Sequence, residues 1–371
     1  MIMPGIAPGM DSTGVLRADD AQLRDATWWQ CQQLDFVLFY GWGDPRYLDV
    51  ARAIRTAGIL LIQNLDAAGI LTPYFDLKEW WVGTFGMIAG PQPVRQKLRL
   101  CGKAVRDFIP KIYEQKRLRM FEESDLLAAV SPPAASSIHH YISALGSNAA
   151  SKLVVLPHPV IPRMYYDGRS KEKRVVCVGR WLREDWHQKD PQMMLDALSV
   201  FLDRNPDWEA EVIGRGSSAL QELIRPRTGL SLQRVTFTER LGREELVERY
   251  LGAKILFCPS RFESYHISSA EALCCGCSVV VADHPLLAST GWFTTRGSGT
   301  SAHRRSFSAL AAALSTEASQ WEAGERSPRD ISEEWCGILH SRSVASQLLK
   351  LVRGTVLDSE VLPPVPNASG T

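Results

Sequence analysis

The chain has 371 residues, a formal net charge of +1 and 22% charged residues, the balance of a soluble globular protein with about two domains. Because the net charge is so small, no chain-wide basic field points to a nucleic-acid partner. No apolar run approaches the ~20 residues of a membrane span, no secretory signal is visible, and eight cysteines are too few for a disulfide scaffold. We therefore expect a cytoplasmic protein with reduced thiols.

Short apolar segments of strand type recur along the whole chain. In chain order they are 35–40, 58–63, 125–130, 152–157, 174–179, 210–214, 234–238, 254–259 and 278–282. Several are solidly apolar rather than alternating, which is typical of strands buried on both faces of a parallel sheet. Helices are expected at 19–33, 46–56, 94–123, 134–145, 191–205, 217–225, 243–252 and 331–352. This alternation of strands and helices predicts an α/β fold.

A segment rich in proline, glycine and charge, Pro157–Lys173, separates four of the predicted strands from the other five. Such a segment interrupts regular structure and marks a domain boundary. We therefore expect two Rossmann-like domains, 1–165 and 166–352, that face each other across a cleft, followed by a tail, 353–371. Residues 1–34 offer no convincing strand, so the first domain looks incomplete.

A glycine motif, G-x-G-x-x-A, spans Gly214–Ala219 between a predicted strand and a predicted helix. The backbone amides of such a loop can approach a phosphate, as in NAD-dependent oxidoreductases. A dinucleotide site would also place an acidic residue about 20 positions further on, and Glu239 comes later than that. A glycine turn that joins strand to helix explains Gly214 and Gly216 equally well.

Two glutamates, Glu263 and Glu271, lie at the next predicted junction of strand, loop and helix. We expect Glu263 in the loop and Glu271 in the first turn of the helix. Ligands of open α/β sheets bind at that edge, where carboxylates could hold sugar hydroxyls while free amides hold a phosphate. The alternative is a capping box, Ser268-x-x-Glu271, in which Glu271 binds an N-cap amide.

Two cations, Arg180 and Lys189, follow the strand predicted at 174–179. Beside the turn at Gly179 they could hold a diphosphate, the arginine as a fork and the lysine as a point charge. The surrounding loop is highly polar, so the alternative is that both cations belong to an ordinary solvated surface.

Three cysteines lie close together after Glu271, namely Cys274, Cys275 and Cys277. A tetrahedral metal site needs four ligands, and no second cysteine pair or nearby histidine pair completes one here. We therefore expect these cysteines to be buried structural residues. No metal and no other cofactor is expected.

Residues 94–119 form a basic stretch with apolar residues between the charges. Nine lysines and arginines stand against two acids, which gives this stretch a net charge of +7. Such a segment can lie on an anionic membrane or accept an acidic substrate. A solvated helix face is the alternative. Peripheral contact with the inner face of a membrane is therefore one expectation for 94–119.

Together these elements resemble the group 1 (family 4) glycosyltransferases of the GT-B fold. The resemblance runs from about Leu126 to Val352 and rests on the order and spacing of short motifs: Ala128-Ala-Val-Ser131, Leu156-Pro-His-Pro159, Val178-Gly-Arg180 with Lys189, Val212-Ile-Gly-Arg-Gly216, and Glu263-x7-Glu271 with Gly276. It implies that a nucleotide-diphosphate sugar is the donor and that transfer proceeds with retention. The acceptor would be a glycan, a lipid-linked molecule or a small molecule.

The resemblance also implies roles for single residues. Arg180 and Lys189 would hold the donor diphosphate, Glu263 the donor sugar, and Glu271 the ribose hydroxyls. The residues expected to carry catalysis are Glu263, Arg180 and Lys189. The expected donor-binding set is Gly179, Arg180, Lys189, Gly214, Gly216, Glu263, Ser264, Tyr265, His266, Ile267 and Glu271.

The chain departs from the family pattern in three places. Ser264-Tyr265-His266 stands where the family usually has Gly-Phe-Gly, so the amide contacts to the sugar could differ. Asn64-Leu-Asp66 stands where a His-Asp pair is common, and the first strand with its glycine-rich loop is not evident. The alternative to an enzyme is therefore a nucleotide-sugar-binding protein without catalysis.

Overall fold

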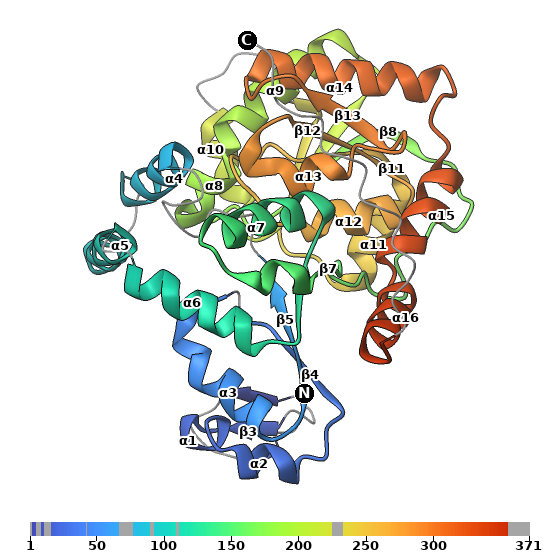
Figure 1. The fold of residues 1–371 in the computed structure, drawn as a ribbon. Coiled ribbons are helices and arrows are strands. Elements are labelled where there is room, and N and C mark those ends of the chain that lie inside the picture. The colour runs from blue at the N-terminus through green and yellow to red at the C-terminus, as the bar shows by residue number, and fades with distance from the viewer. Residues whose placement is uncertain are drawn as a thin grey trace. The chain divides into compact units, whose positions relative to one another are not determined.

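The computed structural model describes residues 2–4, 9–10, 16–41, 43–66, 77–89, 93–108, 111–224 and 233–354. Its contacts divide the chain into two compact units. Figure 1 colours the chain by residue number, from blue at the N-terminus to red at the C-terminus. Unit 1 comprises Met1–Ala67, Val105–Leu156 and Leu348–Thr371, and unit 2 comprises Ala68–Ala104 and Pro157–Gln347. The boundary expected at 165 and 166 falls inside unit 2. Most of the expected tail, from residue 355 on, lies outside the described residues.

Four parallel strands form the main sheet of unit 1. In spatial order they are β4 (Phe36–Phe39), β5 (Leu60–Leu65), β6 (Leu126–Ala129) and β7 (Leu153–Val155). A second, small sheet was not expected from the sequence; its strands are β1 (Ile2–Pro4), β2 (Gly9–Met10) and β3 (Leu16–Ala18). The helix expected at 19–33 is two short helices, α1 (Asp20–Leu23) and α2 (Ala26–Cys31).

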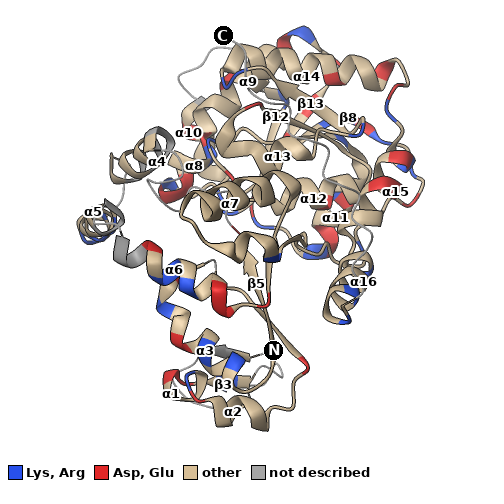
Figure 2. Ribbon diagram, in the orientation of Figure 1, with Lys and Arg blue, Asp and Glu red and all other residues tan. Residues whose placement is uncertain are grey.

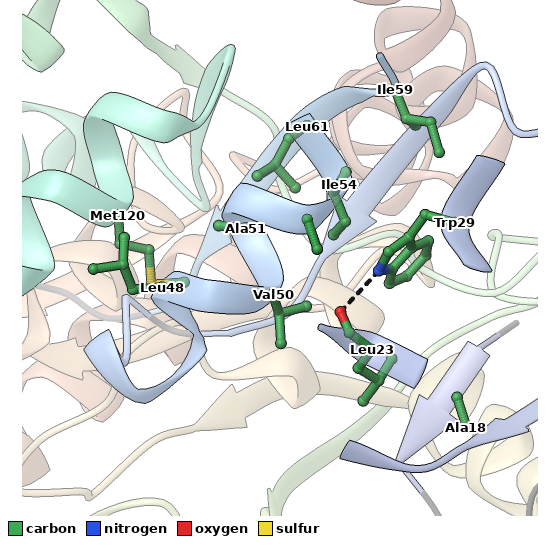
Figure 3. Close-up of a cluster of buried hydrophobic side chains, with 11 residues drawn as sticks. Ala18, Leu23, Trp29, Leu48, Val50, Ala51, Ile54, Ile59, Leu61 and Met120 are labelled. Atoms are coloured by element: carbon green, nitrogen blue, oxygen red, sulfur yellow. Dashed lines mark hydrogen bonds between the residues drawn. The ribbon is translucent and has the colours of Figure 1, made fainter. Parts of the chain in front are cut away.

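A cluster of buried apolar side chains joins the elements of unit 1 (Figure 3). The helix α3 (Leu48–Thr56) contributes Val50 and Ile54, which lie on one face because they are four residues apart. Leu61 of β5 and Trp29 of α2 pack against them. The Trp29 indole nitrogen donates a 2.9 Å hydrogen bond to the Leu23 carbonyl, so the ring is buried with its polar atom satisfied.

Six parallel strands form the sheet of unit 2. They are β8 (Glu172–Val178), β9 (Glu209–Ile213), β10 (Val235–Thr238), β11 (Ala253–Phe257), β12 (Ser278–Ala282) and β13 (Gly299–Ala302). The spatial order is β10-β9-β8-β11-β12-β13, so the sheet grows in one direction from β8 and then in the other from β11. This is the order of a dinucleotide-binding Rossmann sheet. The predicted α/β fold with two Rossmann-like parallel sheets is confirmed.

Within residues 157–347, the helices of unit 2 lie between its strands or follow the last of them. They are α8 (Trp186–Lys189), α9 (Pro191–Arg204), α10 (Gln221–Ile224), α11 (Arg243–Gly252), α12 (Ile267–Cys274), α13 (Ala288–Trp292), α14 (Phe307–Glu322) and α15 (Pro328–Leu339). Helix α9 packs on α14, and α12 packs on α15. The last helix expected at 331–352 is wrong, because the chain is extended at His340 and a second helix, α16 (Ser341–Val352), follows. There Val160 accepts from the Ser341 amide and donates to the Leu339 carbonyl, which stabilises the break.

The remaining helices are α4 (Leu77–Ala89), α5 (Val94–Phe108), α6 (Lys111–Glu123) and α7 (Pro132–Ala144). The single helix expected at 94–123 is therefore two, α5 and α6 (Figure 2). Within α6, Arg117 is buried and bonds the Glu114 carboxylate at 3.0 Å, so its charge does not belong to an exposed basic face. Among the residues that the structure describes, no helix is both long and apolar enough to cross a membrane.

Candidate functional site

The candidate site lies where the strand order of unit 2 reverses. Strands β8 and β11 are direct neighbours, with Val175 beside Ile255. A ligand of an open α/β sheet binds beyond the carboxyl ends of the strands at such a reversal, because the loops diverge there. Gly179 and Arg180 follow β8, and the loop that carries Glu263 follows β11. The topology thus brings together two motifs that are distant in the sequence.

The structure joins two of the predicted site residues in an ion pair. Lys189 Nζ lies 2.5 Å from Glu263 Oε1, and 12% and 8% of the two side chains are exposed. The Glu263 carboxylate also accepts hydrogen bonds from Ser260 Oγ at 2.6 Å and from Gln188 Nε2 at 3.2 Å. Desolvation raises the pKa of Glu263, but the charge of Lys189 and the hydrogen bonds from Lys189 and Ser260 oppose it, so the pKa lies below its usual value. Glu263 is therefore an ionised acceptor.

Two residues that the sequence analysis did not identify, Asp190 and Arg305, connect the two loops that carry Lys189 and Glu263. Asp190 follows Lys189 with a left-handed φ of 47° and caps α9. Its carboxylate lies 2.5 Å from Arg305 Nη2, and Arg305 also donates to the Pro259 and Ser260 carbonyls at 3.1 Å each. Arg305 thus ties the loop after β8 to the loop after β11. The Asp-Pro pair before α9 is a recognisable helix-start signal, whereas nothing in the sequence singles out Arg305.

Arg180 pairs with a different acid. Its guanidinium lies 3.3 Å from the carboxylate of Asp185, and 70% of the Arg180 side chain is exposed. An exposed ion pair of this kind contributes only about 0–1 kcal/mol. The Arg180 side chain can therefore turn toward an anionic ligand at little cost.

Glu271 lies inside α12 rather than in its first turn. The helix begins at Ile267 with His266 as the N-cap, so Ser268 is helical and the capping-box alternative is wrong. Glu271 Oε2 accepts a 3.1 Å hydrogen bond from the Tyr250 hydroxyl. Burial raises the pKa of Glu271 to about 7, although the Tyr250 bond acts in the opposite direction.

The residues between the two glutamates differ in what they offer a ligand. Tyr265 belongs to the core: its ring packs edge-on against His158 and Phe293, with 5.2 Å between ring centroids in each pair. Its hydroxyl donates to the His158 carbonyl at 3.5 Å. Ser264 is half-buried, and Ile267 is 53% exposed although it is apolar. Of these three, Ser264 and Ile267 have side chains that reach the surface.

One group of possible metal ligands lies in the described part of the chain, and it belongs to this site. Ligand atoms of Cys258, Glu263 and His266 lie within 4.8 Å of one another. Burial raises the pKa of Cys258 to about 12, so the thiol stays protonated and is a poor ligand. Since Lys189 already holds Glu263 and the His266 ring bonds Ser269, this set of donors fits a metal badly.

The glycine loop after β9 has a structural explanation. Gly214 has φ +130°, and a Cβ there would lie 1.9 Å from the Gly179 carbonyl, so only glycine fits between the two loops. The carboxylate of Glu239 accepts from the amides of Gly216 and Ser218 at 3.0 and 3.1 Å. Glu239 occupies the amides that a pyrophosphate would need, which disfavours an NAD site at this loop.

The three clustered cysteines are buried free thiols, as predicted. Cys277 donates to the Tyr250 carbonyl at 3.0 Å, and desolvation raises its pKa. Cys274 and Cys275 are also fully buried among the apolar residues of unit 2. The three cysteines thus pack in the core of unit 2, at the end of α12 and just after it.

Sequence comparison matches part of the chain to a family model and to a curated relative. Residues 172–316 match the model of the glycosyl transferases of group 1. The D-inositol 3-phosphate glycosyltransferase of Corynebacterium jeikeium is 35% identical over 117 residues, which are 30% of this chain and 27% of that protein. The chain thus spans about a quarter of the length of this relative. The matched family segment contains both strands of the reversal point and both glutamates.

Solved glycosyltransferase structures are similar over most of the chain. Anabaena HepE in complex with UDP-glucose has a TM-score of 0.55 at 16% identity, over 84% of this chain and 77% of that one. Sucrose-phosphate synthase of Thermosynechococcus elongatus has a TM-score of 0.59 at 14% identity, over 95% and 86%. At these identities the likeness concerns the fold. Residues 172–316 therefore match the group 1 glycosyl transferases, and the chain has the fold of the GT-B glycosyltransferases.

Proposed function

We propose that the chain transfers a sugar from a nucleotide-diphosphate sugar to an acceptor hydroxyl, with retention of the anomeric configuration. The observation that carries this proposal is the buried Lys189–Glu263 pair beside the reversal point of the sheet. Ionised Glu263 can accept hydrogen bonds from sugar hydroxyls. Lys189 and Arg180 are the cations that can hold a diphosphate there.

The proposed chemistry depends on stabilising the leaving group. As the bond from the anomeric carbon to the diphosphate breaks, the sugar becomes oxocarbenium-like and negative charge collects on the diphosphate. Arg180, Lys189 and the amides at the start of α12 supply positive potential for that charge. The acceptor oxygen bonds to the anomeric carbon on the face that the diphosphate leaves, and its proton passes to an oxygen of the departing diphosphate, so the configuration is retained. Because these cations can stabilise the leaving diphosphate without a metal ion, a chelator should not reduce the rate.

Replacing Lys189 tests this function. We expect Lys189→Met to lower turnover about 10²-fold or more, because it removes a cation that acts on the leaving group. The measurement is release of nucleoside diphosphate from a panel of nucleotide sugars, with glycan, lipid-linked and small-molecule acceptors. Lys173→Met is the matched control, since Lys173 forms ion pairs with Asp207 and Glu322 at the surface of the same unit. Full activity of Lys189→Met would contradict the assignment.

The same panel separates an enzyme from a binding protein. If a nucleotide sugar binds and no acceptor in the panel promotes its turnover, the chain is a nucleotide-sugar-binding protein without catalysis. If one donor and acceptor pair supports transfer, product analysis by NMR shows whether the anomeric configuration is retained. An inverted product would overturn the proposed stereochemistry while leaving the transfer itself intact.

We also propose that α5 contacts the anionic inner face of a membrane, which would suit a lipid-linked acceptor. Val94, Leu98 and Val105 are 74%, 67% and 58% exposed, and their spacing places them on one side of the helix. The same helix exposes three cations, Arg95, Arg99 and Lys103. Each cation near an anionic surface can contribute about 1 kcal/mol before screening by salt.

Co-sedimentation with vesicles tests this contact. We expect binding to phosphatidylglycerol vesicles at low salt, with less binding as salt increases and little after Lys97, Arg99 and Lys103 are replaced by Glu. The control reverses the charge of three exposed arginines of unit 2, Arg204, Arg240 and Arg329, and should bind as the wild type does. Absence of binding at low salt would contradict the proposed contact.

A further inference from the structure

Two thiols meet where α12 and α15 pack together. Cys274 is the last residue of α12, and Cys336 lies in α15, one turn after Ser332. The Ser332 hydroxyl donates a 2.5 Å hydrogen bond to the Cys274 carbonyl and lies 3.8 Å from Cys336 Sγ. Cys336 Sγ is itself 3.7 Å from the Cys274 carbonyl oxygen. The two thiol groups also form a hydrogen bond with each other, so their sulfur atoms are neighbours.

The backbone holds the two helices close together at this point. Gly276, just after α12, has a φ of +77°, and a Cβ there would lie 2.4 Å from the carbonyl oxygen of Pro328, the first residue of α15. Only glycine fits so close an approach. A disulfide needs two backbone segments that lie near each other. The contact at Gly276 and the hydrogen bond from Ser332 to the backbone of α12 provide this closeness.

The two thiols differ in exposure and in ionisation. Cys336 is half-buried, so a small molecule in the solvent can reach it, whereas Cys274 is fully buried. The hydrogen bond from the Cys274 thiol lowers the pKa of Cys336 to about 7, and the same bond together with burial raises the pKa of Cys274. The thiolate is the form of cysteine that reacts with peroxides. Cys336 is therefore the attacking thiol of the pair.

We propose that Cys336 is a site of oxidation by hydrogen peroxide and that it then forms a reversible disulfide with Cys274. The Cys336 thiolate attacks one peroxide oxygen and the O–O bond breaks, which leaves a sulfenic acid and releases hydroxide. The Cys274 sulfur then bonds to the Cys336 sulfur, and the displaced hydroxyl group leaves as water with the Cys274 proton. The two thiols lose two electrons, and the peroxide is reduced to water. The disulfide would fasten the end of α12, the helix that carries Glu271.

Peptide mapping of the full chain tests this site. The reduced protein is treated with hydrogen peroxide, its remaining thiols are alkylated, and trypsin releases the peptides 262–296 and 330–342, which carry Cys274 and Cys336. We expect a disulfide between these two peptides in the wild type, and dithiothreitol should remove it. In Cys274→Ala the cross-link should be lost, and Cys336 should stop at the sulfenic acid, which dimedone labels. Cys336→Ser should lose both the cross-link and the label.

Other buried thiols supply the controls. Cys275→Ala removes a buried thiol from the same peptide and should keep the cross-link. Cys177 and Cys258 are fully buried and burial raises the pKa of both, so they should stay reduced in the folded protein. Absence of the cross-link in the folded wild type, or its persistence in Cys274→Ala, would overturn the proposal. Since no nucleotide sugar enters the measurement, failure of the proposed function would leave this result unchanged.

Discussion

At the scale of single residues, Glu271 illustrates how burial sets the ionisation of a carboxylate. Desolvation raises its pKa to about 7, and the hydrogen bond from Tyr250 only partly opposes this shift. A carboxylate with an ordinary pKa would be fully ionised at neutral pH. Glu271 instead changes its charge near neutrality, and only its ionised form accepts hydrogen bonds through both oxygens.

This shift predicts a pH dependence of stability. Between the usual pKa of 4.5 and about 7, the unfolded chain releases the proton of Glu271 while the folded chain keeps it. The free energy of unfolding therefore falls as the pH rises through this window, by up to about 3 kcal/mol. We expect Glu271→Gln to remove this fall, so its stability relative to the wild type should be higher at pH 8 than at pH 5.

Urea unfolding of both proteins at the two pH values measures the difference. Glu333→Gln is the control, because Glu333 is 70% exposed and its removal should not alter the pH dependence. If Glu271→Gln and the wild type lost stability equally between pH 5 and pH 8, the pKa of Glu271 would not be raised.

At the scale of elements, one arginine from a third loop holds the two loops of the candidate site. Arg305 precedes α14, and its guanidinium contacts Asp190 after α8 and the carbonyls of Pro259 and Ser260 after β11. Lys189 and Glu263 are carried by these two loops. The distance between the members of the ion pair therefore depends on Arg305, which lies more than forty residues further along the chain.

Replacing Arg305 should lower turnover by more than the loss of stability alone would. In Arg305→Ala, Asp190 keeps an ion pair with Arg261 at 3.0 Å, while the two loops lose their common partner. Since misplacement by about 1 Å can reduce a rate about 10²-fold, we expect kcat to fall by a factor of ten or more.

Steady-state kinetics well below the unfolding temperature measure this effect. Arg326→Ala is the matched control, because Arg326 forms a comparably buried ion pair with Glu317 at 2.6 Å away from the two loops. We expect both variants to lose thermal stability and only Arg305→Ala to lose turnover. Equal turnover of the two variants would show that Arg305 has a structural role alone.

The sequence predicted the strands better than the breaks between helices. Every strand predicted at 35–282 is present, because a strand buried on both faces must be continuously apolar, as in β12. Strand β13 (GTSA) was missed, since it is short and polar. The break at His340 depends on a bridge to Val160, a long-range contact that no local pattern reveals.

The same distinction applies to the candidate site. The loops after β8 and β11 were predictable, because their motifs follow apolar strands in a fixed order. The ion pair of Lys189 with Glu263 was not, since the resemblance assigned the two residues to different parts of the donor. Tyr250 and Arg305 were missed for a physical reason: each contacts the site through a hydrogen bond between segments that are far apart in sequence.

At the scale of the whole molecule, the reversal of strand order has a consequence for folding kinetics. The pairs β8–β9 and β9–β10 join segments that are close in the chain, whereas β8 and β11 are separated by both of those strands and their helices. Loop-closure entropy makes the more distant pairing slower. Since the candidate site exists only where β8 and β11 meet, we expect it to form late during refolding.

Refolding from urea should therefore show two rates. Far-UV circular dichroism should recover first, because the helices and local strand pairs form early, and binding of a nucleotide sugar such as UDP-glucose should recover more slowly. Stopped-flow measurements with both probes test this order, and a single shared rate would contradict it. The topology that creates the candidate site thus also delays its formation. A newly synthesised chain would pass through an intermediate that has native-like secondary structure but cannot yet bind a donor.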